Sequence, residues 1–277
     1  MRHAKEILIR ARRQIVGDRI GNNPSMFKGE GYDFIELREY VSGDDIRHID
    51  WNVTAKLQRP YVKVFREERE LSVVTVAMVG GAMHFGTDTF KIEKAAEAVA
   101  LVGYSAVGNG DLFTHYTFQE TMLHEIRGTK KHFAVTMSVE EMMKTPLIGH
   151  RADYSVMAST LSKRLRRKSL IVLIGDFFEI PPLKLLAKQH EVVAIIVRDS
   201  FEEKPKSLGF GTLQDPQTGQ TLEGDFNAKR MEHYAQKIHE HDTALFAHLR
   251  SCGIRFVKLY THTNTSVTLR RLFEGRA

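Results

Sequence analysis

The chain has 277 residues, of which 42% are hydrophobic and 27% are charged, with one cysteine and a formal net charge of +6. These values are ordinary for a soluble globular protein, and they exclude an internal disulfide and a cysteine-cluster metal site. No apolar stretch reaches the roughly 20 residues of a membrane span, and the N-terminal residues place charges inside their apolar pattern, unlike a signal peptide. We therefore expect a cytoplasmic protein.

The first 70 residues carry little regular patterning. Residues 3–16 have an apolar stripe and predict an amphipathic helix, whereas residues 17–33 are rich in Gly, Asn and Pro and predict a loop. Residues 33–70 are dense in charges of both signs and lack a periodic apolar face. We expect them to be irregular and held in place by polar contacts.

From residue 71 onward, strand and helix patterns alternate. Strands are predicted at 71–79, 111–118, 121–126, 169–178, 191–199 and 254–261. Helices are predicted at 88–110 (with Asp88 as N-cap), within 129–145, and at 153–168, 181–190 (with two prolines in its first turn), 225–253 and 264–276.

Runs such as "LIVLI" and "VVAIIV" are typical of strands that are covered on both faces, and the close pair at 111–126 fits an antiparallel edge. The sequence thus predicts an α/β fold, a doubly wound, mostly parallel sheet with one antiparallel edge strand, at residues 71–277. Residues 1–70 form the preceding helical and irregular part.

In such a sheet, ligands bind at the carboxyl ends of strands where the strand order reverses. The turn after residue 79 offers no side-chain oxygen, and His84 alone is an expected surface histidine. After the strand at 169–178, Asp176 is expected to bond backbone amides of its turn, and Asp153 to cap a helix. A divalent-metal-dependent hydrolase that uses Asp176 and Asp153 remains an alternative.

Residues 29–70, the signature segment, form the densest polar cluster, with Asp44, Asp45 and Asp50 among basic neighbours such as Arg47. No nucleophile and base can be paired there, so the segment indicates binding rather than catalysis. Four histidines of the long predicted helix are expected on a solvated face: His233, His239, His241 and His248. The basic stretches "RARR" and "KRLRRK" leave an anionic-membrane or nucleic-acid binder as a further alternative.

The stretches "GEGYDFIELREYVSGDDIRHIDWNVTAK" and "YVKVFREERELSV" resemble the signature of the bacterial DUF58 family. The resemblance implies a second part similar to a von Willebrand factor A domain. It also implies a non-enzymatic adaptor without a cofactor, acting with a MoxR-type AAA+ ATPase on an unknown client protein. The residues expected to bind partners are Arg38, Glu39, Tyr40, Gly43, Asp44, Asp45, Arg47, Asp50 and Trp51.

Many relatives end the first strand in Asp-x-Ser-x-Ser-Met, which begins a metal-ion-dependent adhesion site. Here Met83 matches the Met, while the Asp and Ser positions hold Met78, Gly80 and Ala82. The distal Thr position holds Ala152, and only Asp176 matches an expected ligand. The resemblance therefore implies a degenerate site that holds no metal.

Overall fold

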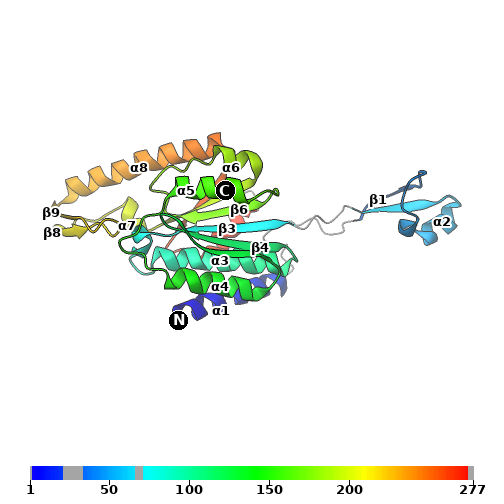
Figure 1. The fold of residues 1–277 in the computed structure, drawn as a ribbon, viewed down its shortest axis with the longest axis horizontal. Coiled ribbons are helices and arrows are strands. Elements are labelled where there is room, and N and C mark those ends of the chain that lie inside the picture. The colour runs from blue at the N-terminus through cyan, green and yellow to red at the C-terminus, as the bar shows by residue number, and fades with distance from the viewer. Residues whose placement is uncertain (1, 21–33, 66–70, 274–277) are drawn as a thin grey trace. The chain divides into compact units, whose positions relative to one another are not determined.

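The computed structural model describes residues 2–20, 34–65 and 71–273, which form two compact units (Figure 1). The first unit comprises residues 1–27 and 71–277, and the second, the signature unit, comprises residues 28–70. The sequence grouped the N-terminal helix with the signature segment, and the structure differs. Helix α1 (Arg2–Ile20) packs on the first unit through a stripe that includes Ile7, Leu8 and Ala11.

A six-stranded sheet with the order β10-β7-β6-β3-β4-β5 forms the centre of the first unit. Its strands are β3 (Ser72–Met78), β4 (Leu112–Phe118), β5 (Met122–Thr129), β6 (Leu170–Gly175), β7 (Glu191–Arg198) and β10 (Arg255–Tyr260). All neighbours are parallel except β4 and β5, which pair antiparallel at one edge. The predicted doubly wound sheet with one antiparallel edge strand is confirmed.

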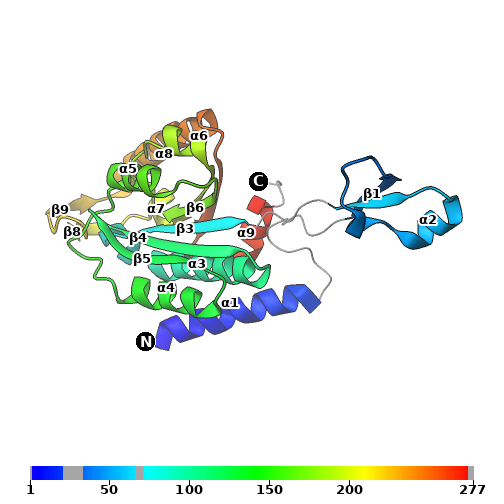
Figure 2. The ribbon, with the colours of Figure 1, turned by 45° about the vertical axis from the view of Figure 1, so that its right-hand side comes forward.

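Helices cover both faces of this sheet (Figure 2). One face packs against α1, α3 (Lys91–Gly108), α4 (His132–Lys144) and α9 (Thr265–Phe273). The other face packs against α5 (Tyr154–Arg164), α6 (Lys184–Gln189) and α8 (Ala228–Ser251). Side chains of β3 alternate between the two layers, with Val73 and Ala77 on one side and Val74 and Val76 on the other.

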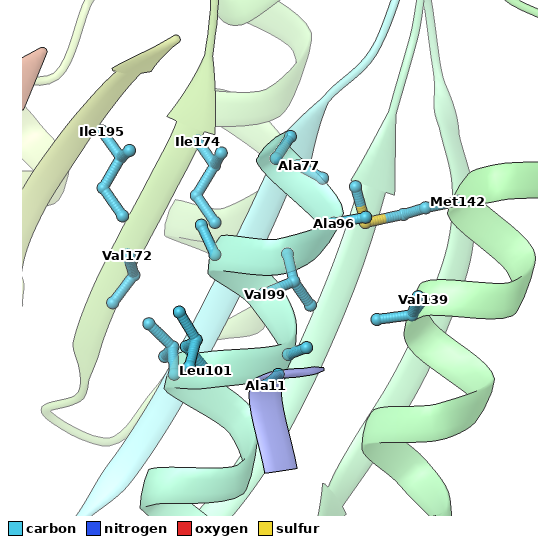
Figure 3. Packing of buried hydrophobic residues seen from close by; sticks show 14 of the residues in the cluster. Ala11, Ala77, Ala96, Val99, Leu101, Val139, Met142, Val172, Ile174 and Ile195 are labelled. Carbon is cyan, nitrogen blue, oxygen red and sulfur yellow. The ribbon is translucent and has the colours of Figure 1, made fainter. Parts of the chain in front are cut away.

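The core beneath α3 is closely packed (Figure 3). Val99 of α3, Val139 of α4 and Ile174 of β6 are fully buried in it. Each such aliphatic side chain contributes about 1.5–3 kcal/mol when it is removed from water. This apolar burial on two faces is why the continuous Val/Ile/Leu runs become central strands.

Several predicted boundaries in the first unit were wrong. Helix α3 begins at Lys91 with Phe90 as N-cap rather than Asp88, because the carbonyl of Phe90 accepts the first helical bond, from the N–H of Lys94 (3.3 Å). The two prolines precede α6 instead of lying in its first turn, and α1 extends beyond residue 16. The long helix α8 begins at Ala228, since Asn227 caps it by accepting from the N–H of Arg230 (3.2 Å).

Three elements between β7 and α8 had no counterpart in the prediction. A short helix, α7 (Ser200–Glu203), is followed by an antiparallel hairpin of β8 (Gly209–Gln214) and β9 (Thr221–Phe226). Most hairpin side chains are exposed on both faces, so no apolar alternation marks these strands. The hairpin lies at the end of the first unit near α7 (Figure 1).

The signature unit contains an antiparallel strand pair, β1 (Phe34–Glu39) and β2 (Tyr61–Phe65). Between the strands lie a 3-10 turn, η1 (Ile46–His48), and a short helix, α2 (Trp51–Leu57). The expectation of an irregular segment was therefore wrong. The strands are only five and six residues long and far apart in the sequence, which hides their pairing from a search for periodicity.

Candidate functional site

Backbone contacts and caps fix the loop that joins β1 to β2. Tyr40 donates its N–H to the carbonyl of Pro60 (2.8 Å), and Asp50 donates to the carbonyl of Tyr61 (2.9 Å). The Asp50 carboxylate caps α2 by accepting from the N–H groups of Asn52 and Val53 (2.9 and 3.1 Å). Asp50 is therefore a structural residue, since it starts the helix that carries Trp51.

A two-bond fork joins Arg38 to Asp44, with both N–O distances at 2.7 Å. Asp44 also accepts from the N–H of Val41 (2.9 Å) and so closes the turn after β1. The hydrogen bonds from Arg38 and then from Val41 hold the pKa of Asp44 below its usual value. Gly43 has a φ of +111°, a conformation that L side chains rarely adopt, so the turn requires glycine there.

The other predicted acids of this unit are also paired. Asp45 accepts from the guanidinium of Arg47 (2.7 Å), which lowers the pKa of Asp45, and Glu39 accepts from Arg59 (3.0 Å). Asp50 pairs with Lys63 (2.9 Å), and this bond is the main reason for its lowered pKa. Carboxylates held ionised by cationic partners are unsuited to proton transfer near neutral pH. The structure thus assembles the signature residues as a polar scaffold.

This scaffold presents large apolar side chains to water. The exposed fractions are 68% for Trp51, 65% for Ile46, 62% for Val41 and 55% for Leu57. Among the described side chains of the unit, Val62 is the buried hydrophobic one. Exposed aromatic and aliphatic side chains on an ordered polar frame are typical of a protein-binding surface. The predicted partner-binding residue Trp51 therefore lies on the surface, whereas Asp44 and Asp50 maintain its shape.

The positions predicted from the adhesion-site pattern lie together at the carboxyl ends of β3 and β6, where the strand order reverses. A Cβ at Gly80 would lie 3.0 Å from the backbone nitrogen of Ala152, and one at Gly175 would lie 2.9 Å from the Cβ of Met78. Met78 is buried, and Ala82 lies in the 3-10 turn η2 (Gly81–His84). Side chains without oxygen thus occupy four of these positions.

Asp176 follows β6, and both its carboxylate and its backbone carbonyl accept hydrogen bonds. Its carboxylate accepts from the hydroxyl of Tyr154 and the N–H of Phe178, both at 3.3 Å, and Arg198 donates to its carbonyl. The Tyr154 hydroxyl also accepts from the N–H of Phe177 (2.9 Å), and burial raises the pKa of Tyr154. The expectation that Asp176 bonds a turn amide is confirmed. Asp153 caps α5, as predicted, by accepting from Ser155 and Val156.

Phe177 has a φ of +53°, an uncommon conformation for a residue with a bulky side chain. It is held there because its ring is buried and its carbonyl contacts His241 of α8 (2.8 Å). Similarly, His248 contacts the carbonyl of Pro181 (2.9 Å). These two histidines fasten α8 to the turn after β6. Their expected place on a solvated face was wrong, whereas His233 and His239 are exposed.

The tip of the β8–β9 hairpin closes over the turn after β3. The Pro216 carbonyl accepts from the N–H of Gly149 (2.8 Å), and a Cβ at Gly81 would lie only 2.2 Å from that same oxygen. The turn after β3 therefore requires glycine at residue 81, because backbone from the hairpin fills the space that a side chain would need. The sequence marked the Gly-Gly pair but not the segment that packs on it.

The buried carboxylate of Asp199 connects the turn after β3 to the sheet. Asp199 accepts from the N–H and hydroxyl of Thr87 (2.9 and 3.1 Å), from the hydroxyl of Thr261 (2.6 Å) and from the N–H of Phe201 (2.9 Å). Burial alone would raise the pKa of Asp199, but these hydrogen bonds lower it. This fully buried carboxylate is a structural residue that joins the turn after β3 to the ends of β7 and β10.

Within residues 2–20, 34–65 and 71–273, no three His, Cys, Asp or Glu side chains form a group that is able to hold a metal ion. His84 stacks on Phe90 with 4.7 Å between ring centroids.

In the same described ranges, no helix is both long and apolar enough to cross a membrane.

The sheet order and the helices on both faces define a doubly wound α/β domain, and the chain also contains a small unit with exposed apolar side chains. The family model described as "Protein of unknown function DUF58" matches residues 36–244, well over half of the chain. The chain belongs to the DUF58 family.

Relatives that match most of the chain are named as uncharacterized proteins. Uncharacterized proteins of Mycobacterium tuberculosis and Mycobacterium bovis are 26% identical over 264 residues, covering 92% of this chain and 83% of theirs. Among solved structures, an aerotolerance-related membrane protein of Bacteroides fragilis has 11% identity and a TM-score of 0.46, covering 74% of this chain and 98% of its own. The VWA domain of SpRpn10 has 12% identity and a TM-score of 0.42, with coverages of 74% and 94%.

Proposed function

We propose that this protein is a non-enzymatic, cytoplasmic adaptor whose signature unit binds a protein partner, and that this partner is a MoxR-type AAA+ ATPase. The exposure of Trp51, Ile46, Val41 and Leu57 carries the proposal. Burial of such side chains in an interface supplies binding energy, and tryptophan in particular is enriched among residues that dominate it. The family resemblance supports the choice of an ATPase as partner.

The paired acids of the same unit support binding over catalysis. Asp44, Asp45 and Asp50 each face a cation at 2.7–2.9 Å. They order a loop that contributes little apolar burial of its own. The turn residues Met78, Gly80, Ala82 and Ala152 offer no metal ligand, which supports partner capture through apolar and polar contacts rather than through a bridging cation.

The test is a pull-down of the tagged full-length chain from its native cells, with and without ATP, with partners identified by mass spectrometry. The variant carries Ile46→Ser and Trp51→Ser, because both side chains are exposed and neither caps nor pairs in the unit. The matched control is Phe133→Ser on α4, which is 67% exposed. Recovery of an AAA+ ATPase by the wild type and the control, with loss in the double variant, is expected.

Recovery of the ATPase by the double variant would refute the signature unit as the docking surface. Absence of any AAA+ ATPase in both nucleotide states would refute the partner itself. Far-UV circular dichroism of each variant checks that the fold is intact. A substitution at Asp50 is a poor test, since it removes the cap of α2 together with any contact to a partner.

A further inference from the structure

A cavity of about 530 Å³ lies among the β8–β9 hairpin, α7, α8 and the turns after β3 and β6. Its lining is mostly apolar and includes Phe85, Phe178, Phe201, Leu213, Met231 and Tyr234. Both acids of the lining have partners, since Glu202 pairs with the buried ammonium of Lys91 (2.6 Å) and Asp215 accepts from the hydroxyl of Thr218 (2.6 Å). Its chemistry fits apolar side chains, and its volume lies in the range of ligand pockets.

Strand β8, which forms one wall of this cavity, has an open edge. Asp215 donates its N–H to the carbonyl of Gln220 (2.8 Å), and the register pairs Thr212 with Glu223. Because antiparallel ladders alternate, the backbone N–H and C=O groups of Phe210, Thr212 and Gln214 point away from β9. The ladder has two strands, so within the described ranges no third strand receives these groups.

The two edges of the hairpin differ in how strongly they oppose pairing with another strand. Charged residues or proline at an exposed strand edge commonly prevent such pairing in proteins. Strand β9 has Glu223 and Asp225 at its outward positions, whereas β8 has the sequence GFGTLQ without charge or proline. Leu213 and Gln214 of β8 line the cavity, and no residue of β9 does so. The edge without charge or proline and the wall of the cavity therefore both belong to β8.

The hairpin also has a distinct charge. Residues 207–227 contain three acidic residues and no Lys, Arg or His, in a chain with a net charge of +6. Phe210 is 75% exposed and lies opposite Asp225, so one face combines an aromatic ring with the carboxylates of Asp225 and Glu223. Arg230 approaches the other face, at Gly224. The first face is thus complementary to basic side chains.

We propose that β8 binds an extended segment of a client protein as a third strand, which inserts an apolar side chain into the cavity and places basic side chains over Glu223 and Asp225. Backbone hydrogen bonds at the open edge supply affinity, and the cavity selects among sequences. This inference rests on the proposed adaptor function, and it assigns the client to a surface different from the one proposed for the ATPase.

The probe is a fluorescent heptapeptide, acetyl-Lys-Phe-Lys-Leu-Lys-Phe-Lys-amide, whose binding to the full-length chain is measured by fluorescence anisotropy. The variant Thr212→Pro removes one outward N–H of β8 and leaves the bonds to β9 in place. The matched control Thr221→Pro removes an outward N–H of β9. We expect at least tenfold weaker binding for Thr212→Pro and a change within twofold for Thr221→Pro.

A second measurement needs no variant. The same heptapeptide, N-methylated at alternate residues so that its strand donors are lost, should bind the wild-type chain at least tenfold more weakly. Equal binding of the methylated peptide, no binding of the parent peptide, or equal weakening by both proline substitutions would overturn the proposal. A concentration-dependent dimer of the wild type that is lost in Thr212→Pro would identify a second copy as the occupant and would also overturn it.

The two proposals fail separately. Thr212→Pro should recover the ATPase as the wild type does, and the Ile46→Ser, Trp51→Ser variant should bind the peptide as the wild type does. Peptide binding without recovery of an ATPase refutes the ATPase as partner and leaves the β8 surface supported. Recovery of the ATPase without peptide binding overturns the β8 surface alone.

Discussion

His115 of β4 should make the stability of the first unit depend strongly on pH. Its ring is buried between two hydroxyls, with Nδ1 2.8 Å from Thr75 Oγ1 and Nε2 3.0 Å from Thr117 Oγ1. Burial, with a smaller contribution from His124, lowers the pKa of His115 from 6.5 to about 3. The folded protein therefore keeps this imidazole neutral at any pH above about 3.

The sign follows from proton linkage. At pH 5 the unfolded chain binds a proton at His115, because its pKa is then about 6.5, whereas the folded chain does not. Acid thus favours unfolding as the pH falls below 6.5, and the loss continues until the folded pKa near 3. From pH 7.5 to pH 5, this one group removes about 2 kcal/mol from the free energy of unfolding, at about 1.4 kcal/mol per pH unit.

Urea unfolding at pH 7.5 and pH 5.0, followed by far-UV circular dichroism, measures this loss. The single tryptophan, Trp51, lies in the signature unit, so its fluorescence does not report on the first unit. The variant His115→Gln lacks this titrating group. From pH 7.5 to pH 5.0, its free energy of unfolding should therefore decrease by about 2 kcal/mol less than that of the wild type. His239→Gln, at an exposed position of α8, is the control and should behave as the wild type. An equal pH dependence of wild type and His115→Gln would refute the reasoning.

Three further outcomes are expected. Gly81→Ala places a Cβ 2.2 Å from the Pro216 carbonyl oxygen, so it should lift the hairpin tip and speed proteolysis of the hairpin; an unchanged cleavage rate would contradict this. Asp242→Ala leaves the fully buried Arg198 without its carboxylate partner at 2.9 Å. The free energy of unfolding in urea should therefore decrease by about 3–5 kcal/mol. The control Glu240→Ala, on the same helix but at an exposed ion pair, should leave the urea midpoint unchanged. Addition of Mg²⁺, Mn²⁺ or Ca²⁺ should leave the thermal midpoint unchanged, whereas a site filled at 100 times its dissociation constant would add about 2.7 kcal/mol.

The central sheet was predictable because its strands bury both faces. β6 and the middle of β7 are continuous apolar runs, and β3 has the single polar residue Thr75 within its apolar run, so the burial of these strands can be seen in the sequence. The N-cap at Asp153 was equally predictable, since an Asp directly before a periodic apolar run is a local sequence signal. Both features depend on neighbouring residues and not on where distant segments lie.

The parts that the sequence missed depend on distant contacts. The hairpin strands β8 and β9 bury little, so their residues alternate in no detectable way. The close packing of Gly81 on Pro216 joins residues 135 positions apart (216 − 81), and a glycine pair alone does not tell which backbone approaches it. In the signature unit, the fork between Arg38 and Asp44 follows from charge pairing, but the exposure of Trp51 does not, because tryptophan is more often buried than exposed.

The closed carboxyl end of the sheet bears on how partners are bound. A serine at Gly80, a Ser position of the proposed degenerate metal site, would need its neighbours to shift by a few tenths of an ångström, because its Cβ would lie 3.0 Å from the Ala152 nitrogen and the His150 carbonyl oxygen. Gly81, which lies between the two Ser positions of the pattern, has no room for a side chain either, since a Cβ there would lie 2.2 Å from the Pro216 carbonyl oxygen. A ligand side chain at residue 80 therefore requires the loop before α5 to shift. The hairpin that covers this end also carries the β8 edge to which we assign the client, so the proposed contacts use backbone, apolar and basic groups of the client rather than a bridging cation.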